Sequence, residues 1–213
     1  MQYLIFDFDG VIWDSWDATV SAYMQNHDET DRAKVENYLL TERLVTPRYT
    51  KDRVYSEAET AELIAYREME YIAKSKFNPQ PFFAFVEELK KVKDVKMAIV
   101  STAYQPLLEE AVVKFGLEGK FSHIFGFGAN FSKERCVENI CEDWEIDLDQ
   151  AYFFTDTLRD VVEMKNILDH TKIIGCKWGW HGERLLEELP AEQILDEPID
   201  FETFLLEIEE ESE

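Results

Sequence analysis

A buried parallel strand is predicted by the run Gln2-Tyr3-Leu4-Ile5-Phe6, which continues into Asp7-Phe8-Asp9-Gly10-Val11. Asp7 and Asp9 are two positions apart, so an extended chain places both side chains on the same side. Gly10 then allows a sharp turn. Sheets of α/β proteins bind ligands at the carboxyl ends of their strands, and two like charges there need a positive neighbour to stay ionised together. The pattern therefore indicates a site for a hard cation and a nucleophile, although Asp9-Gly10 alone also fits an ordinary turn.

The composition of the chain limits its class and its partners. With 213 residues, of which 46% are hydrophobic, it can form one globular domain or one domain with an insertion. The net charge of −23 disfavours nucleic acid and anionic membrane surfaces, so an anionic substrate needs a local positive site. No apolar run reaches membrane-spanning length, no signal peptide is evident, and the three cysteines lack metal-ligand spacing. We therefore expect a cytoplasmic protein with reduced thiols, either a monomer or a homodimer.

Five segments have the composition of strands, and the later ones alternate with segments of helical periodicity. This alternation predicts an α/β fold with a doubly wound parallel sheet, in which right-handed crossovers connect the strands. The expected strands are Gln2–Asp7, Lys96–Ser101, Ser122–Phe127, Ala151–Thr155 and Lys172–Cys176.

The connection between the first two expected strands is unusually long, at about 90 residues. A helix from Pro81 to about Val92 accounts for the return to the sheet, but the remainder is too long for a loop. We predict a small inserted helical cap domain, residues 14–80, and a core domain of residues 1–13 and 81–213. The helices expected in the cap span 15–27, 31–43 and 56–75, followed by the return linker Asn78-Pro79-Gln80-Pro81.

Two carboxylates follow the fourth expected strand. Asp156 and Asp160 are four positions apart across a strand-to-helix turn, which brings them close together. One interpretation is a divalent-ion site shared with Asp7, since Mg²⁺ binds one or two carboxylates together with substrate oxygens. The other is a helix capping box formed by Thr157 and Asp160.

Ser101-Thr102 and Lys133 stand near the ends of the second and third expected strands. Hydroxyls and the amides at a helix start can hold a phosphate, whereas Thr102 with Gln105 also fits a capping box. Lys133 can balance carboxylates and hold a transferring phosphoryl group, or it can be an ordinary exposed lysine.

Taken in order, these four segments resemble the motifs of the haloacid dehalogenase superfamily of phosphotransferases and hydrolases. The resemblance covers nearly the whole chain, and the insertion resembles the helical cap that this family carries after its first motif. Trp178-Gly179 is also similar to phosphoglycolate-phosphatase-like members. Two departures stand out: Thr155 replaces a Gly that many relatives have, and Glu134-Arg135 follows Lys133 in place of Lys-Pro-x-Pro.

The resemblance implies a HAD-like Rossmannoid core and a role for each matching residue. Asp7 is the implied nucleophile that becomes phosphorylated, and Asp9 the implied acid and base. Mg²⁺ is the implied cofactor, held by Asp7, the backbone carbonyl of Asp9 and Asp156, with Asp160 supporting it directly or through water. The implied phosphate-binding residues are Ser101, Thr102 and Lys133.

The expected cap contains a cluster of basic residues, Arg43, Arg48, Lys51 and Arg53. It is either a solvated patch that answers nearby glutamates or a source of substrate specificity. Under the second hypothesis, Arg48 or Arg53 enters the closed site and binds a second anionic group of the substrate.

The function predicted from these residues is a Mg²⁺-dependent phosphatase that hydrolyses a small soluble phosphate monoester through an aspartyl-phosphate. A phosphomutase of the same superfamily, similar to β-phosphoglucomutase, is the nearest alternative. A non-catalytic module that binds a phosphorylated metabolite is another, although buried carboxylates without a use are costly.

Overall fold

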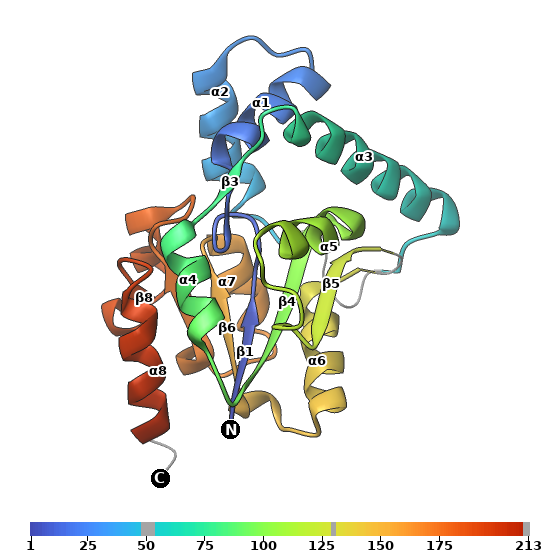
Figure 1. The fold of residues 1–213 in the computed structure, drawn as a ribbon. Coiled ribbons are helices and arrows are strands. Elements are labelled where there is room, and N and C mark those ends of the chain that lie inside the picture. Colours follow the sequence, from blue (N-terminus) through green and yellow to red (C-terminus); the bar gives the residue numbers. More distant parts are fainter. Residues whose placement is uncertain (48–53, 129–130, 211–213) are drawn as a thin grey trace.

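The computed structural model describes residues 1–47, 54–128 and 131–210. Six strands form one parallel sheet in the order β5-β4-β1-β6-β7-β8, which confirms the predicted doubly wound α/β fold (Figure 1). Four strands lie within one or two residues of the predicted bounds, and β4 continues three residues beyond its predicted end. The strands are β1 (Gln2–Phe6), β4 (Val95–Tyr104), β5 (His123–Phe127), β6 (Ala151–Thr155), β7 (Ile173–Cys176) and β8 (Ile194–Leu195).

Helices cover both faces of this sheet. Successive side chains of β1 point to opposite faces, and each face packs against a different set of helices. Leu4 and Phe6 pack with α4, α5 and α8, whereas Ile5 packs with α6 and α7. All three side chains are fully buried, as expected for a central parallel strand. The bounds of these helices are α4 (Phe83–Lys91), α5 (Gln105–Lys114), α6 (Lys133–Trp144), α7 (Leu158–Met164) and α8 (Asp200–Glu210).

The order of the strands determines where a ligand-binding site can lie in this sheet. From β1 the chain moves outward to β4 and β5, and then returns to β6 on the other side of β1. Loops that leave β4 and β6 therefore diverge over the carboxyl end of β1, which is where sheets of this kind bind ligands. Asp7 follows β1 directly, so its carboxylate lies at this switch point.

The insertion between β1 and β4 is helical, as predicted, and lies over the carboxyl edge of the sheet (Figure 1). Its elements are α1 (Trp16–Asn26), α2 (Arg32–Tyr38), the π-helical turn η1 (Leu39–Arg43) and α3 (Glu57–Ser75). One predicted helix, 31–43, is thus divided into α2 and η1, because the last five residues adopt a wider turn that periodicity does not distinguish.

Two short strands join the insertion to the core. β2 (Trp13–Asp14) runs antiparallel to β3 (Gln80–Pro81), and the amide of Phe82 donates to the carbonyl of Ile12 at 2.9 Å. The predicted linker therefore pairs as a strand along the outgoing chain. Like β8, β3 has only two residues, so neither shows a recognisable strand pattern in the sequence.

Candidate active site

Asp7 lies at the centre of the carboxyl edge and is 5% exposed. Its amide donates to the carbonyl of Phe154 in β6 at 2.9 Å, which ties the residue to the neighbouring strand. Oδ1 accepts from the amide of Phe8 at 2.7 Å, and Oδ2 lies 2.7 Å from Nζ of Lys133. Burial raises the pKa of Asp7 to about 7, although Lys133 opposes this shift. The carboxylate is therefore held in place by an amide and an ammonium, and further positive charge beside it would favour its ionised form.

Lys133 joins two of the predicted carboxylates. It is 1% exposed at the start of α6, and its Nζ lies 2.5 Å from Oδ2 of Asp160, which also accepts from Oγ1 of Thr155 at 3.0 Å. Burial alone raises the pKa of Asp160, but Lys133 and Arg159 outweigh it and hold that pKa well below its usual range. The interpretation of Lys133 as an ordinary exposed lysine is therefore wrong.

Asp160 also belongs to the capping box predicted at the N-terminus of helix α7. Oγ1 of Thr157 accepts from the amide of Asp160 at 3.4 Å, so the first half of the capping box is present. The Asp160 side chain, however, turns to Lys133, and it is fully buried. Capping and a role in the charged cluster thus coexist in this residue.

Asp156 is fully buried against two glycines. A Cβ on Gly10, whose φ is +78°, would lie 1.9 Å from Oδ2 of Asp156, and one on Gly179 would lie 2.2 Å from its Cβ. Only glycine fits such close approaches. Oδ2 accepts from the amide of Trp180 at 2.8 Å, whereas Oδ1 has no hydrogen-bond partner among the described residues. Burial, reinforced by the charge of Asp7, raises the pKa of Asp156 well above its usual value.

Ser101 and Thr102 lie on β4, beside β1. Ser101 is 1% exposed, and its Oγ accepts from the amide of Ala103 at 3.2 Å. The capping interpretation of Thr102 with Gln105 is wrong, because β4 continues through Tyr104 and α5 begins at Gln105 without a side-chain cap. Both hydroxyl residues instead line the pocket over Asp7.

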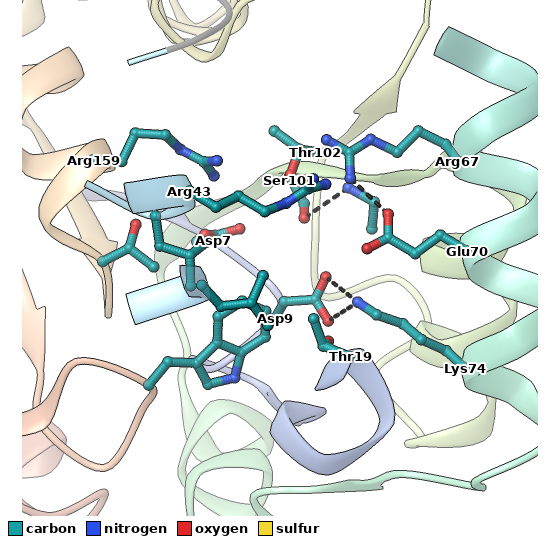
Figure 2. Close-up of a pocket in the computed structure, with 15 residues that line it drawn as sticks. Asp7, Asp9, Thr19, Arg43, Arg67, Glu70, Lys74, Ser101, Thr102 and Arg159 are labelled. Carbon is teal, nitrogen blue, oxygen red and sulfur yellow. Dashed lines mark hydrogen bonds and ion pairs between the residues drawn. The ribbon is translucent and has the colours of Figure 1, made fainter. Parts of the chain in front are cut away.

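Asp9 points from the core toward the insertion. Its two carboxylate oxygens lie 3.1 and 3.2 Å from Nζ of Lys74 on α3 (Figure 2). The hydroxyl of Ser15 donates to Oδ1 of Asp9. Lys74 is 4% exposed, and its ammonium lies 5.8 Å from the ring of Trp13 and 5.9 Å from that of Trp180. The ion pair therefore bridges core and insertion across a largely buried gap.

The described residues enclose a pocket of about 40 Å³ between the insertion and the carboxyl edge (Figure 2). Its charged wall on the insertion side consists of Arg43, Arg67, Glu70 and Lys74. On the core side the lining includes Asp7, Asp9, Ser101, Thr102 and Arg159. Lys133, Asp156 and Asp160 lie behind this lining as buried partners. The specificity residues predicted from the sequence, Arg48 and Arg53, lie outside the described residues.

Comparison with known proteins identifies the family. Residues 4–168 match the family model of haloacid dehalogenase-like hydrolases, and this segment contains all four predicted motifs. The chain belongs to this family. The predicted resemblance is therefore confirmed. No curated protein matched the chain.

Solved structures share the fold of this haloacid dehalogenase-like hydrolase at low sequence identity. A haloacid dehalogenase-like family hydrolase from Streptococcus pneumoniae has a TM-score of 0.70 and 17% identity, with 96% of this chain and 98% of that chain covered. A Clostridium acetobutylicum protein described as a predicted phosphatase has a TM-score of 0.68 and 20% identity, with 97% and 98% covered. A Thermotoga maritima protein described provisionally as a β-phosphoglucomutase has a TM-score of 0.65 and 19% identity, with 98% and 100% covered. At such identities the likeness concerns the fold alone.

The carboxylates of this family member fit a divalent cation that also binds the substrate. Within residues 1–47, 54–128 and 131–210, no three His, Cys, Asp or Glu side chains gather closely enough to form a complete protein cage. Mg²⁺ does not need one, because it usually takes one or two carboxylates with waters and phosphate oxygens. Asp156 presents a buried oxygen without a partner and is electrostatically coupled to Asp7. Burial raises the pKa of both residues, and a cation beside them would oppose that shift by favouring the ionised carboxylates.

Several pocket residues were not predicted as site residues. Arg67, Glu70 and Lys74 are three and four positions apart on α3, so they share one helical face. This charged stripe is visible in the sequence, but it is equally typical of a solvated face. Arg159 lies inside a predicted motif but was not predicted as a site residue. It is 5% exposed, and its Nε lies 3.5 Å from Oδ1 of Asp160.

The helices of the described residues include none that is both long and apolar enough to cross a membrane.

Proposed function

We propose that this haloacid dehalogenase-like hydrolase is a Mg²⁺-dependent phosphatase that cleaves a small phosphate monoester through a phosphorylated Asp7. The observation that carries the proposal is the position of Asp7. Its carboxylate lies at the switch point of the sheet, held by an amide and by Lys133 and coupled to Asp156, at the edge of the pocket. Phosphoryl transfer mainly needs such positioning and charge neutralisation.

The first chemical step forms a bond between an Asp7 oxygen and phosphorus. As the bond from phosphorus to the ester oxygen breaks, Asp9 gives its proton to the departing alkoxide, which leaves as an alcohol. Lys133 and the hydroxyl residues Ser101 and Thr102 hold the phosphoryl oxygens while negative charge is redistributed among them.

The second step hydrolyses the acyl phosphate. Asp9, now ionised, accepts a proton from a water molecule as the water oxygen attacks phosphorus. The bond between phosphorus and the Asp7 oxygen breaks, which releases inorganic phosphate and restores both carboxyl groups. Asp9 is suited to this alternation because it lies at the pocket wall and contacts residues of both core and insertion.

Asp7 and Asp156 are the residues proposed to hold Mg²⁺, together with the carbonyl of Asp9. Asp160 supports the site from behind, because its Oδ2 already contacts Lys133 and Thr155. When bound, the cation offsets the negative charge of the carboxylates and of the phosphoryl group. The repulsion between the Asp7 carboxylate and the phosphate ester is thereby reduced.

The insertion is proposed to act as a mobile cap. Its Lys74 reaches Asp9, and its arginines line the pocket, so the closed position shields the phosphoryl group from bulk water. An opening motion must accompany turnover, because a pocket of about 40 Å³ leaves little room for an ester to enter.

Phosphate release from p-nitrophenyl phosphate tests this proposal. We expect steady-state release with Mg²⁺ and none after EDTA treatment, with activity restored by added Mg²⁺. A broad panel of phosphate esters should follow the same dependence. No release from any ester in the presence of Mg²⁺ would contradict the phosphatase proposal and favour a binding module. Accumulation of a sugar bisphosphate in place of free phosphate would favour a mutase.

A further inference from the structure

A second cleft lies where the insertion meets the core, beside the short strands β2 and β3. Its volume is about 350 Å³, which is within the range of about 300–1,000 Å³ that is typical of sites for small ligands. Four aromatic side chains line it: Trp16 comes from the insertion, and Phe82, Trp178 and Trp180 come from the core. Trp180 also lines the pocket over Asp7, so the two spaces lie on either side of one residue.

The charged side chains of this cleft are acidic. Asp14 and Glu36 line it, and the described residues of its lining include no lysine, arginine or histidine. Glu36 is paired, because Nε of Arg32 lies 2.7 Å from its Oε1. For Asp14, partial burial and the negative charge of Asp17 raise the pKa, and no cation is among the causes that would lower it. The cleft therefore combines an aromatic lining with one carboxylate that lacks a compensating charge.

Neighbouring groups hold the aromatic rings in place. The ring centroids of Trp16 and Trp180 are 5.5 Å apart, with an angle of 56° between the ring planes, so insertion and core each supply one side of a corner. The indole N–H of Trp178 donates to the carbonyl of Val11 at 3.0 Å, and the ring of Trp178 lies 5.1 Å from that of Phe85. The polar atom of Trp178 is thus satisfied within the protein, and its ring surface can line the cleft.

We propose that this cleft binds a small organic cation whose ammonium nitrogen carries alkyl groups, such as a trimethylammonium compound. The faces of aromatic rings attract such cations, and indole rings attract them most strongly. A quaternary ammonium has no N–H donors that burial would leave unsatisfied, and its charge compensates Asp14. The ring of Trp180 already lies 5.9 Å from one ammonium, Nζ of Lys74. This inference does not depend on the phosphatase proposal, since the carboxylates of the cleft disfavour a phosphate ester.

Choline and 3,3-dimethylbutan-1-ol form a matched pair of probes, because the two molecules have nearly the same shape and differ in the charge of one atom. Titrations of the unaltered protein, followed by the NMR signals of the indole N–H groups, give both dissociation constants. We expect a value of about 0.1–10 mM for choline and a value at least about 10-fold higher for the neutral alcohol. Sodium chloride at the same ionic strength is the control for screening by salt.

The same signals locate the bound cation. The chain has five tryptophans, and in protein labelled at tryptophan we expect choline to shift the indole signals of Trp16, Trp178 and Trp180. The signal of Trp144 should stay in place, because Trp144 belongs to α6 and does not line the cleft.

Two variants test the contributions of ring and charge. Trp16→Leu removes one ring but keeps an apolar side chain, and we expect it to weaken choline binding by about 10-fold. Asp14→Asn removes the carboxylate charge with little change in shape, and it should weaken choline binding by about 3- to 10-fold while leaving the neutral alcohol unchanged. The control is Asp28→Asn, since Asp28 is an exposed carboxylate of the insertion outside the cleft. Its φ of 49° is one that asparagine also tolerates.

Three results would overturn the inference: equal affinity for choline and the neutral alcohol, unchanged choline affinity in a folded Trp16→Leu, or no indole shift at a choline concentration of about 100 mM. If Trp16→Leu fails to fold, the indole shifts of the unaltered protein and the affinity of Asp14→Asn decide. All of these measurements concern binding, so failure here leaves the phosphatase proposal intact, and absence of phosphatase activity leaves this inference intact.

Discussion

The two walls of the pocket are built in different ways. On the core side, Asp7 and Ser101 belong to the ends of adjacent parallel strands, and Lys133 and Asp156 follow the next two strands outward. Their positions follow from the backbone hydrogen bonds of the sheet and from the buried ion pairs that Lys133 makes with Asp7 and Asp160. On the cap side, Arg43, Arg67, Glu70 and Lys74 come from helices, and their positions depend on ring contacts and short ion pairs.

Under the proposed function, this difference separates the residues that carry out the reaction from those that select the substrate. The core wall would then present the groups that every phosphate ester needs, in a frame that the sheet makes rigid. Under the proposed function, the cap wall presents groups that could distinguish one ester from another, on a layer joined to the core by two short strands. Changes to the core wall should therefore affect all substrates and the fold, whereas changes to the cap wall should affect particular substrates or cap closure.

The largest effect is expected from Asp7→Asn. The amide keeps the shape of the side chain but cannot attack phosphorus, so turnover should fall by at least about 1,000-fold for every ester. Phosphate release measures the loss, and a thermal melt shows that the fold persists. Asp149→Asn, which removes an exposed carboxylate far from the cluster, should leave turnover unchanged. Substantial residual turnover by Asp7→Asn would exclude Asp7 as the nucleophile.

Lys133→Met should have the largest effect on stability. It leaves Asp7 and Asp160 buried without their shared cation, which typically costs about 3–5 kcal/mol of the free energy of unfolding. Urea denaturation measures this loss. The matched control is Lys177→Met, since Lys177 also contacts two carboxylates at 2.7 Å but near the surface, and it should destabilise the fold far less than Lys133→Met. Equal losses in the two variants would contradict a special role for the buried cluster.

A pH-dependent loss of stability is expected from His181, which connects the core to the cap. Its Nδ1 accepts from the amide of Leu158 at 2.8 Å, and its Nε2 contacts the carbonyl of Leu40 at 3.2 Å. Burial, with help from Arg184, lowers the pKa of His181 to about 4. Below the unfolded pKa of about 6.5 the unfolded chain binds a proton that the folded chain does not, so stability falls as pH drops through this window, by up to about 2 kcal/mol at pH 5.

His181→Asn provides the comparison for that prediction. The variant retains an acceptor near Nδ1 but has no imidazole to protonate, so its loss of stability between pH 7.5 and pH 5 should be smaller than that of the unaltered protein. Urea denaturation at both pH values gives the two differences. If they are equal, other groups account for the acid sensitivity.

The smallest effect is expected from Lys74→Met. Lys74 contacts Asp9 across the interface, but Asp9 keeps its contact with Ser15 and is partly open to solvent, so the free energy of unfolding should fall by less than in Lys133→Met. The variant should instead loosen the cap, which limited proteolysis of the α3 region can detect. Lys76→Met, at the exposed end of the same helix, is the control. Unchanged proteolysis of Lys74→Met would show that this ion pair does not hold the cap closed.

The core wall could be predicted from the sequence because parallel strand ends converge at one edge. Once Asp7, Ser101 and Asp156 are assigned to strand ends, their proximity follows from the strand order. The environment of Lys133 could not be predicted, because burial of an ammonium between two carboxylates depends on how α6 and α7 pack.

The cap wall could not be predicted for a related reason. A charged stripe such as Arg67, Glu70 and Lys74 is the same in sequence whether it faces water or a neighbouring domain. The cluster of basic residues suggested either a solvated patch or a specificity role for Arg48 or Arg53, whereas the contacts of Arg43 with Tyr23 and Tyr66 involve residues about 20 positions away on either side. Such contacts become visible only when the helices are placed in space.

The paired strands β2 and β3 carry a consequence for how this protein can be rebuilt. They bring the chain into and out of the insertion side by side, at hydrogen-bonding distance. A tight turn could therefore replace residues 15–79 without stretching the backbone of the core. The insertion is in this sense an exchangeable module: transplanting the corresponding segment from a relative should alter which esters are accepted while leaving the six-stranded scaffold intact.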